Sequence, residues 1–225
     1  MCSKWLFWQA IYVLGILAGL SNAHTLLAQI SIDGQEQALN KCIRPYWKSP
    51  NFPVQDVTSE DLQCRTSSMS WSSTDTCSLA AGSKMTLRWN RNKNGNQDVI
   101  SASHVGPCLV YMAPQVSNEK DYSWFKIYED GYDSSAQKWC TEKLIANGGT
   151  VDVTIPADIK PGNYLVRSEL IALHGARREG GCQFFPNCVQ VQVTGGGSAV
   201  PEGVPLPGYY KKDDPGILYA RKDDN

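Results

Sequence analysis

Apolar and polar residues alternate in several stretches of the chain, and clusters of Gly, Pro, Asn and Asp separate these stretches. Such a period of two predicts β-strands, because successive side chains of a strand point to opposite faces. Several short strands with turn residues between them indicate an all-β fold, an immunoglobulin- or fibronectin III-like β-sandwich with long loops. The clearest candidates are residues 85–89, 108–112, 151–155, 164–175 and 189–195.

Helix is expected to be minor, with SSAQKWCTEKLIAN at 134–147 as the best candidate. The tail from Gly195 onward is rich in Gly and Pro, and by composition alone it could be a disordered linker. Its apolar side chains predict instead that it packs along the sandwich, through Tyr209, Tyr210, Ile217, Leu218 and Tyr219.

The N-terminus has the pattern of a secretory leader. Lys4 precedes the apolar run at 6–20, and Ser21-Asn22-Ala23 then offers small residues for cleavage after Ala23. A membrane anchor, the alternative, would need about 20 apolar residues. We therefore expect a signal peptide at 1–23, a single domain at 24–225 without an appended carbohydrate-binding module, and a secreted, extracellular protein that has no membrane contact.

The composition of the chain limits which partners it can bind and in which compartment it can fold. A net charge of -1 argues against nucleic acid, which needs a basic face. Eight cysteines suit an oxidising compartment, and seven remain once Cys2 leaves with the leader. Seven is odd, so at least one thiol stays free or pairs outside the chain. A zinc site is weakly supported, because the mature chain contains no CxxC pair.

The chain has three histidines, His24, His104 and His174, and any one alone is more typical of an ordinary surface or core residue. Cleavage after Ala23 would make His24 the N-terminus, whose α-amine has a pKa of about 7.7–8 and readily gives up a proton to a metal. Amine and imidazole could then chelate together, and His104 would complete three nitrogen donors. Such donors suit Cu(II). An uncleaved leader would turn the amine into an amide and destroy this site.

The run GGCQFFPNC places Gln183 and Phe185 on one face of a predicted strand and Phe184 on the other. A glutamine beside an aromatic residue and near histidines is a plausible outer partner of a metal site. Ordinary strand alternation produces the same pattern.

Taken together, long segments of the mature chain resemble the fungal lytic polysaccharide monooxygenases of auxiliary activity family 9, formerly glycoside hydrolase family 61. The resemblance covers nearly the whole mature chain, and its motifs are specific only in combination. It rests on His24 and on the segments 42–64, 103–113 (SHVGPCLVYMA), 124–132 (WFKIYEDGY), 155–176, 180–198 and 207–219 (PGYYKKDDPGILY).

This resemblance implies one copper ion held by His24 and His104. It places His174 and Gln183 beside the ion, where they would hydrogen-bond an oxygen species, and it places Tyr210 on a flat face for stacking on sugar. The family usually has tyrosine at the axial copper position, and Phe185 stands there in this chain. We expect a working site with altered redox tuning.

The resemblance also bears on the disulfides. Cys64 with Cys188 matches the usual family bridge. Cys108 and Cys182 replace residues that are usually apolar on neighbouring strands, so they could form an extra bridge. Pairing Cys42 with Cys77 is a guess, which leaves Cys140 as the odd thiol.

The function implied is a monomeric copper monooxygenase that cleaves cellulose or a related β-1,4-glucan at C1 and/or C4. It would use an external electron donor and O₂ or H₂O₂ as co-substrates. The alternative is a non-catalytic polysaccharide- or copper-binding protein, suggested by Phe185 and the unusual cysteines. A hydrolase is disfavoured, because hydrolysis needs two carboxylates flanking the bond, and Glu129, Asp130 and Asp133 look like loop acids.

Overall fold

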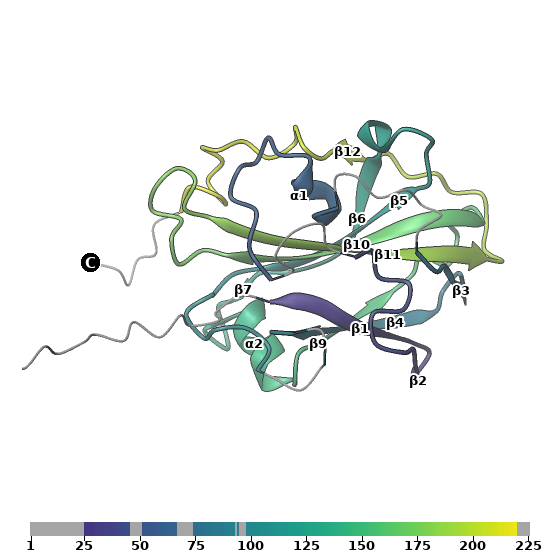
Figure 1. Ribbon diagram of the computed structural model, residues 1–225, viewed down its shortest axis with the longest axis horizontal. Coiled ribbons are helices and arrows are strands. Elements are labelled where there is room, and N and C mark those ends of the chain that lie inside the picture. The colour runs from purple at the N-terminus through teal and green to yellow at the C-terminus, as the bar shows by residue number, and fades with distance from the viewer. Residues whose placement is uncertain (1–24, 46–50, 67–73, 93, 95–97, 220–225) are drawn as a thin grey trace, which may run out of the picture.

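Two stacked sheets form the frame of the protein in the computed structural model (Figure 1). The structure describes residues 25–45, 51–66, 74–92, 94 and 98–219. The predicted leader and His24 lie outside these residues. The architecture confirms the predicted β-sandwich.

The smaller sheet has the strand order β2-β1-β4-β9, and all its pairings are antiparallel. Two of these strands coincide with the alternating segments at 85–89 and 151–155. Met85, Leu87 and Trp89 are fully buried, as their alternation predicts. The strand bounds are β1 Leu26–Ile32, β2 Gln35–Glu36, β4 Lys84–Asn90 and β9 Thr150–Thr154.

The larger sheet has the order β12-β6-β5-β10-β11-β3 and is antiparallel except for the β11–β3 pair. Its long central strands β10 and β11 cover most of the predicted segments at 164–175 and 189–195, although β10 ends at Ala172 and β11 at Thr194. The bounds are β3 Cys77–Ala80, β5 Cys108–Pro114, β6 Ser123–Asp130, β10 Gly162–Ala172, β11 Gln183–Thr194 and β12 Val204–Pro205.

Apolar side chains cover both faces of the larger sheet. One cluster fills the space between the sheets and includes Trp89, Val166 and Phe185. A second cluster, with Leu165 and Phe184, lies on the outer face beneath the short helix α1 (Asp61–Cys64) and the C-terminal segment (Figure 1). Strand β10 is therefore buried on both faces from residue 164 to residue 172.

The C-terminal segment packs along the sandwich, as its apolar residues predict. Val204 pairs with Trp124 of β6, and Ile217 is buried in the outer cluster. Two of the predicted anchors stay largely in solvent, however, because Tyr209 is 52% exposed and Leu218 is 39% exposed.

The helix predicted at 134–147 is only half correct. Helix α2 spans Cys140–Ala146, and the residues before it form a hairpin of β7 (Tyr132–Asp133) and β8 (Lys138–Trp139). An Asp133 carboxylate oxygen accepts hydrogen bonds from the Ser135 and Ala136 amides, which stabilises the turn in competition with a helix. The Glu142 carboxylate accepts from the Trp139 amide at 2.8 Å, and the helix begins there.

Among the described residues, the remaining helical element is a short 3₁₀ turn, η2, at Glu119–Asp121. Within the described part of the chain, no helix is long and apolar enough to cross a bilayer.

The acids expected in loops lie on strands instead. Glu129 and Asp130 end β6, and Asp133 ends β7. Glu129 and Asp130 form ion pairs with Lys126 and Lys143, at 2.8 Å and 2.6 Å. Each of these two carboxylates therefore has a basic partner in the fold.

Three disulfides join the described cysteines. Cys64–Cys188 and Cys42–Cys77 form as predicted, whereas Cys108 pairs with Cys140 across 5.7 Å between their Cα atoms.

The predicted Cys108–Cys182 bridge is therefore wrong, because the two residues belong to clusters on opposite faces of the larger sheet. Cys182 rather than Cys140 is the odd thiol among the described residues. Burial raises the pKa of Cys182 to about 12, so its thiol is protonated at neutral pH and unreactive.

Candidate metal centre

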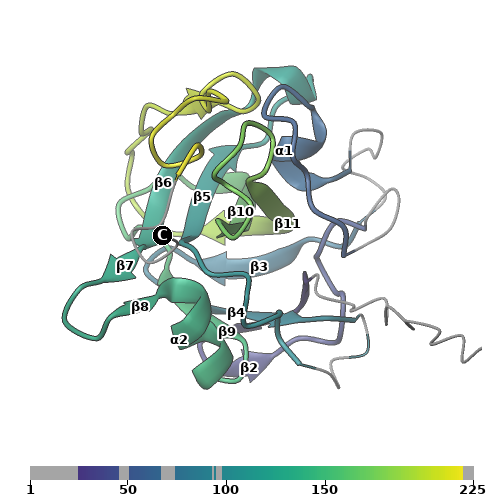
Figure 2. The same cartoon turned by 90° about the vertical axis from the view of Figure 1, so that its left-hand side faces the viewer.

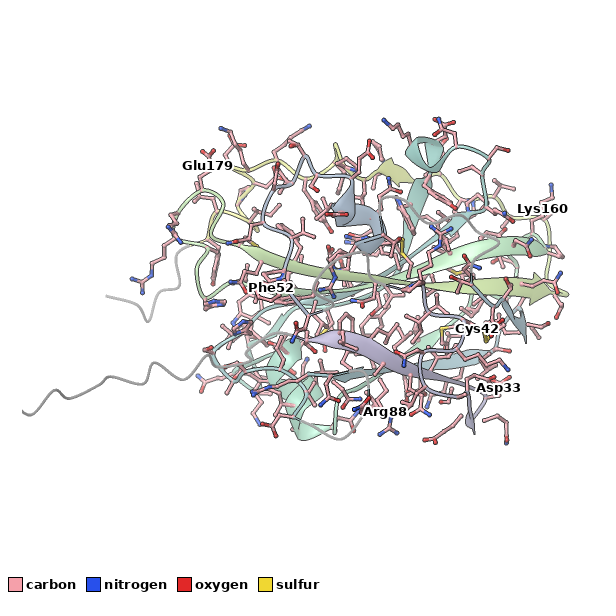
Figure 3. All side chains as sticks on the ribbon, viewed as in Figure 1. Asp33, Cys42, Phe52, Arg88, Lys160 and Glu179 are labelled. Carbon is pink, nitrogen blue, oxygen red and sulfur yellow. A yellow bond between two sulfur atoms is a disulfide. The ribbon has the colours of Figure 1, made fainter. Side chains whose placement is uncertain are left out.

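Two loops bring histidines to the same end of the sandwich. Strand β10 runs between Lys160 at one end of the molecule and the loop containing Glu179 at the other (Figure 3). His174 follows β10 at the Glu179 end, and Gln183 begins β11 opposite Ala172. The predicted site residues His174 and Gln183 therefore lie at the same end of the larger sheet.

The loop containing His104 is fixed to this end by backbone hydrogen bonds. The Leu173 amide donates to the Val105 carbonyl at 2.8 Å, and the Ile171 amide donates to the Pro107 carbonyl at 3.0 Å. Between them, Gly106 lies so close to β10 that a Cβ atom there would be 1.9 Å from the Ile171 carbonyl oxygen. Glycine is therefore required for this loop to reach the strand.

The side chains of His104, His174 and Phe185 lie together. The imidazole rings are stacked, with centroids 4.2 Å apart and 29° between their planes, and the Phe185 ring is 6.1 Å from His104. His104 is only 4% exposed, whereas His174 is open to solvent on one side. Partial burial nevertheless lowers the pKa of His174. The structure thus brings the side chains of these three residues together.

The orientation of His104 is held by a serine. Ser103 Oγ lies 3.1 Å from His104 Nδ1 and 3.0 Å from Ser101 Oγ. With Nδ1 in this contact, Nε2 is the ring nitrogen that would ligate a metal. Ser103 was not among the predicted site residues, although it stands next to His104 in the sequence.

Gln183 contributes a polar atom without a partner. Its Oε1 is buried and accepts no hydrogen bond from any described residue. Leaving a buried acceptor unpaired costs about 1–3 kcal/mol, so such atoms are rare unless a ligand or solvent completes them. The side chain shares the strand face of Phe185, as predicted.

Phe185 is fully buried and offers no oxygen or nitrogen. Its phenyl ring packs in the cluster between the sheets, and the Arg65 guanidinium carbon lies 5.8 Å from the ring centroid. Arg65 also donates from Nε to the Pro186 carbonyl at 3.0 Å. The ring therefore forms an apolar floor beside His104.

The first described residue is anchored at the same end of the sandwich. Thr25 Oγ1 donates to the Val99 carbonyl at 2.7 Å, and Arg65 Nη2 donates to the Thr25 carbonyl at 3.4 Å. Two residues further along the chain, the Leu27 amide donates a hydrogen bond to Asn187 Oδ1 at 3.2 Å. No sequence pattern marks Thr25, Arg65 or Asn187, because the hydrogen bonds that join Arg65 to Thr25 and Leu27 to Asn187 span 40 and 160 residues.

Tyr210 packs on the outer face of the larger sheet, and its place on a flat face beside the metal stays a prediction. Its ring stacks on Phe184, on the face of β11 opposite to Phe185, with centroids 5.6 Å apart. Its hydroxyl donates to Glu169 Oε2 at 2.8 Å. Both ring and hydroxyl thus serve packing, and burial raises the pKa of the phenol well above its usual range.

The donors present fit a copper site that is completed from outside the described residues. In that part of the chain no three His, Cys, Asp or Glu side chains come together to hold a metal. His104 supplies one imidazole, a donor that suits Cu(II), and the buried oxygen of Gln183 suits a polar species next to it. His24, the predicted second ligand, precedes the anchored Thr25 directly.

Comparison with known proteins gives a family. The sequence profile of "Auxiliary Activity family 9 (formerly GH61)" matches residues 24–225. An AA9 family lytic polysaccharide monooxygenase A of Aspergillus niger is 42% identical over 214 residues, which is 93% of this chain and 52% of the relative. A monooxygenase B of Emericella nidulans is also 42% identical, over 93% of this chain and 59% of its own length. The chain thus spans about half the length of these curated relatives.

Solved structures show the same likeness. The protein named CvAA9A superposes with a TM-score of 0.79 at 36% identity, over 88% of this chain and 91% of that one. A cellulose-active polysaccharide monooxygenase from M. thermophila gives a TM-score of 0.68 at 28% identity, over 87% of this chain and 90% of that one.

Proposed function

This chain belongs to Auxiliary Activity family 9, and from this we propose that it is a copper-dependent lytic polysaccharide monooxygenase. The observation that supports this most directly is the group of His104, His174 and Gln183 at one end of the sandwich. Two stacked imidazoles, with an unpaired buried amide oxygen at the same end of the sheet, suit an ion and its small ligand better than they suit a structural core.

We propose that the copper ligands are His104 and the amine and imidazole of His24. Thr25 is held by hydrogen bonds next to the loop that leads to His104, which suits a ligand one residue earlier. Cleavage after Ala23 would create the amine. Three disulfides agree with the secretion that this cleavage implies.

When bound, copper would supply redox chemistry, taking electrons from an external donor and reacting with O₂ or H₂O₂ to oxidise a glycosidic carbon, C1 and/or C4. The protein's own residues would do the rest. Stacking on His174 and the Ser103 contact hold the His104 ring in one orientation. Gln183 would hydrogen-bond a species beside the ion, and the buried Phe185 ring would exclude water from the side of His104 that it faces.

The substrate we propose is cellulose or a related β-1,4-glucan. The similarity to a structure described as cellulose-active supports it, as does the family's polysaccharide chemistry in the names of its curated members. The substitution of Phe185 for the usual tyrosine is compatible with turnover, because the residue contributes packing and would not be a required donor.

The test is a pair of measurements on the secreted mature chain. Titration calorimetry with Cu(II) should show tight binding in a chain that begins at His24, and none in His104→Ala or in a chain that retains Ala23. Incubation with swollen cellulose, copper and a reductant should release oligosaccharides oxidised at C1 or C4, detected by mass spectrometry.

Each result has a distinct meaning. Copper binding without oxidised products would favour the non-catalytic binding protein. Unchanged copper affinity in the chain that retains Ala23 would refute the proposed role of the His24 amine.

A further inference from the structure

Three aromatic side chains form a group outside the histidine site. Tyr132 and Trp139 are cross-strand partners in the β7–β8 hairpin, with ring centroids 5.3 Å apart. Tyr219 meets the Trp139 ring edge to face at 5.9 Å. Trp139 and Tyr219 are half-buried, but Tyr132 is 52% exposed, so its ring is the part of this group that faces solvent.

The hairpin separates its aromatic residues from its charged ones. Asp133 pairs with Lys138 across the hairpin, next to the Tyr132–Trp139 pair. Neighbouring residues of a strand point to opposite faces, so one face of the hairpin is aromatic and the other is charged. An exposed ring on an uncharged face suits a neutral partner.

Helix α2, which directly follows the hairpin, is hydrogen-bonded to the loop of His104. The Gly106 amide donates to Thr141 Oγ1 at 2.9 Å, and the Thr141 amide donates to the Gly106 carbonyl at 3.2 Å. Thr141 is two residues after Trp139, and Gly106 is two residues after His104. The hairpin and the histidine loop are therefore close neighbours in the structure.

Tyr219, the third aromatic residue of the group, is hydrogen-bonded to the loop that contains His174. The Tyr219 amide donates to the Ala176 carbonyl at 2.8 Å, and Ala176 is two residues after His174. The hairpin lies at the end of the molecule that faces the viewer in Figure 2. The aromatic group is thus continuous with the end of the sandwich that carries both histidines.

We propose that Tyr132 stacks on a glucose unit of the β-1,4-glucan, while Trp139 and Tyr219 position its ring. This inference rests on the proposed function, which supplies the substrate. A β-linked glucose ring is neutral and has all its ring hydroxyls equatorial, so both faces expose C–H groups that pack on an aromatic ring.

The ring geometry limits the site to one sugar. The Tyr132 and Trp139 planes are tilted by 53°, and Trp139 and Tyr219 are nearly perpendicular at 83°. Three such rings do not form a continuous platform. Tyr132 is therefore a binding contact for a single glucose unit at a distance from the reacting bond, and its loss should weaken binding more than chemistry.

The experiment uses the mature chain and cellohexaose, with affinity measured by calorimetry. Tyr132→Ala should weaken binding about two- to tenfold, while Tyr132→Phe keeps the ring and should bind as the parent protein does. Tyr209→Ala is the matched control, because Tyr209 is also 52% exposed but lies beside Tyr210 on the outer-face cluster. Its affinity should not change, and copper affinity should be the same in all three variants.

Two results would overturn the inference alone: unchanged cellohexaose affinity in Tyr132→Ala, or equal losses in Tyr132→Ala and Tyr209→Ala. If the parent protein binds copper but neither binds nor oxidises any glucan, the proposed function fails and this inference fails with it. The parent protein's behaviour thus separates the two failures.

Discussion

Strands β10 and β11 carry polar groups at two places, and the two groups differ in how completely they are bonded. On the outer face, Arg167 and Glu169 are both 0% exposed and paired with each other. Arg167 also donates to the Leu62 and Gln63 carbonyls at the end of α1, at 2.7 Å and 3.0 Å. Glu169 receives a further hydrogen bond from the Tyr210 hydroxyl. We call this group the outer-face network.

The polar groups at the histidine end of the sheet are not completely hydrogen-bonded in this way. Gln183 Oε1 accepts nothing from the described residues, and His174 is open to solvent. A buried charge pair that is fully hydrogen-bonded can be explained by folding alone, whereas an unpaired buried acceptor costs stability. The difference indicates that the outer-face network serves the fold and the histidine end serves a ligand.

The largest expected effect comes from breaking the outer-face network. Glu169→Leu leaves the Arg167 charge buried without its partner, which should lower the free energy of unfolding by about 3–5 kcal/mol. The measurement is urea unfolding followed by fluorescence. The control is Asp152→Ala, which removes an ion pair with Lys84 whose side chains are 56% and 49% exposed, and it should cost no more than about 1 kcal/mol. Equal losses would remove the contrast between buried and surface pairs.

Copper should stabilise the protein through the histidine end alone. At a free concentration about a thousand times the dissociation constant, a ligand that binds only the folded state adds about 4 kcal/mol. The parent protein should show this increase in thermal melts, and His104→Ala should not. Tyr210→Phe should keep it, because Tyr210 lies on the other face. If copper no longer stabilised Tyr210→Phe, the outer-face network and the histidine end would be energetically coupled.

The sequence predicts the features of this contrast that depend on neighbouring residues, and not those that depend on residues far apart in the chain. The opposite directions of Phe184 and Phe185 follow from the period of two, which is a local property, and both were predicted correctly. The packing of Tyr210 against Phe184 could not be predicted, because the segment around Tyr210 has no regular period. The Cys108–Cys140 bridge was missed because it depends on where α2 begins, which the Glu142 side chain determines.

Tyr210 offers a smaller test of the outer-face network. Tyr210→Phe keeps the ring stacked on Phe184 but removes a hydrogen bond to the Glu169 carboxylate. A hydrogen bond to a charged group contributes about 1.5–3 kcal/mol, and unfolding experiments should show a loss in that range. Tyr209→Phe is the control on the exposed neighbour and should have no effect. A loss below about 0.5 kcal/mol would show that Glu169 is satisfied without Tyr210.

The smallest loss of stability is expected at Gln183, and it is the most direct test of the contrast. Gln183→Leu removes an acceptor that has no partner in the described protein, so the free energy of unfolding should not fall, and relief of the unpaired oxygen should raise it. Gln190→Leu is the matched control on the same strand, since Gln190 Oε1 accepts from Arg44 Nε at 3.1 Å and its Nε2 donates to the Thr74 carbonyl at 3.0 Å. It should cost at least about 1–3 kcal/mol, because a buried donor loses its acceptor.

Turnover should show the reverse order. Changes to outer partners of metal sites typically cost about ten- to a hundredfold in activity or affinity, so Gln183→Leu should reduce the yield of oxidised oligosaccharides by that factor. Gln190→Leu, assayed below its melting temperature, should oxidise cellulose as the parent protein does. If Gln183→Leu instead loses stability and keeps its activity, the unpaired oxygen is part of the fold, and the distinction between the two groups disappears.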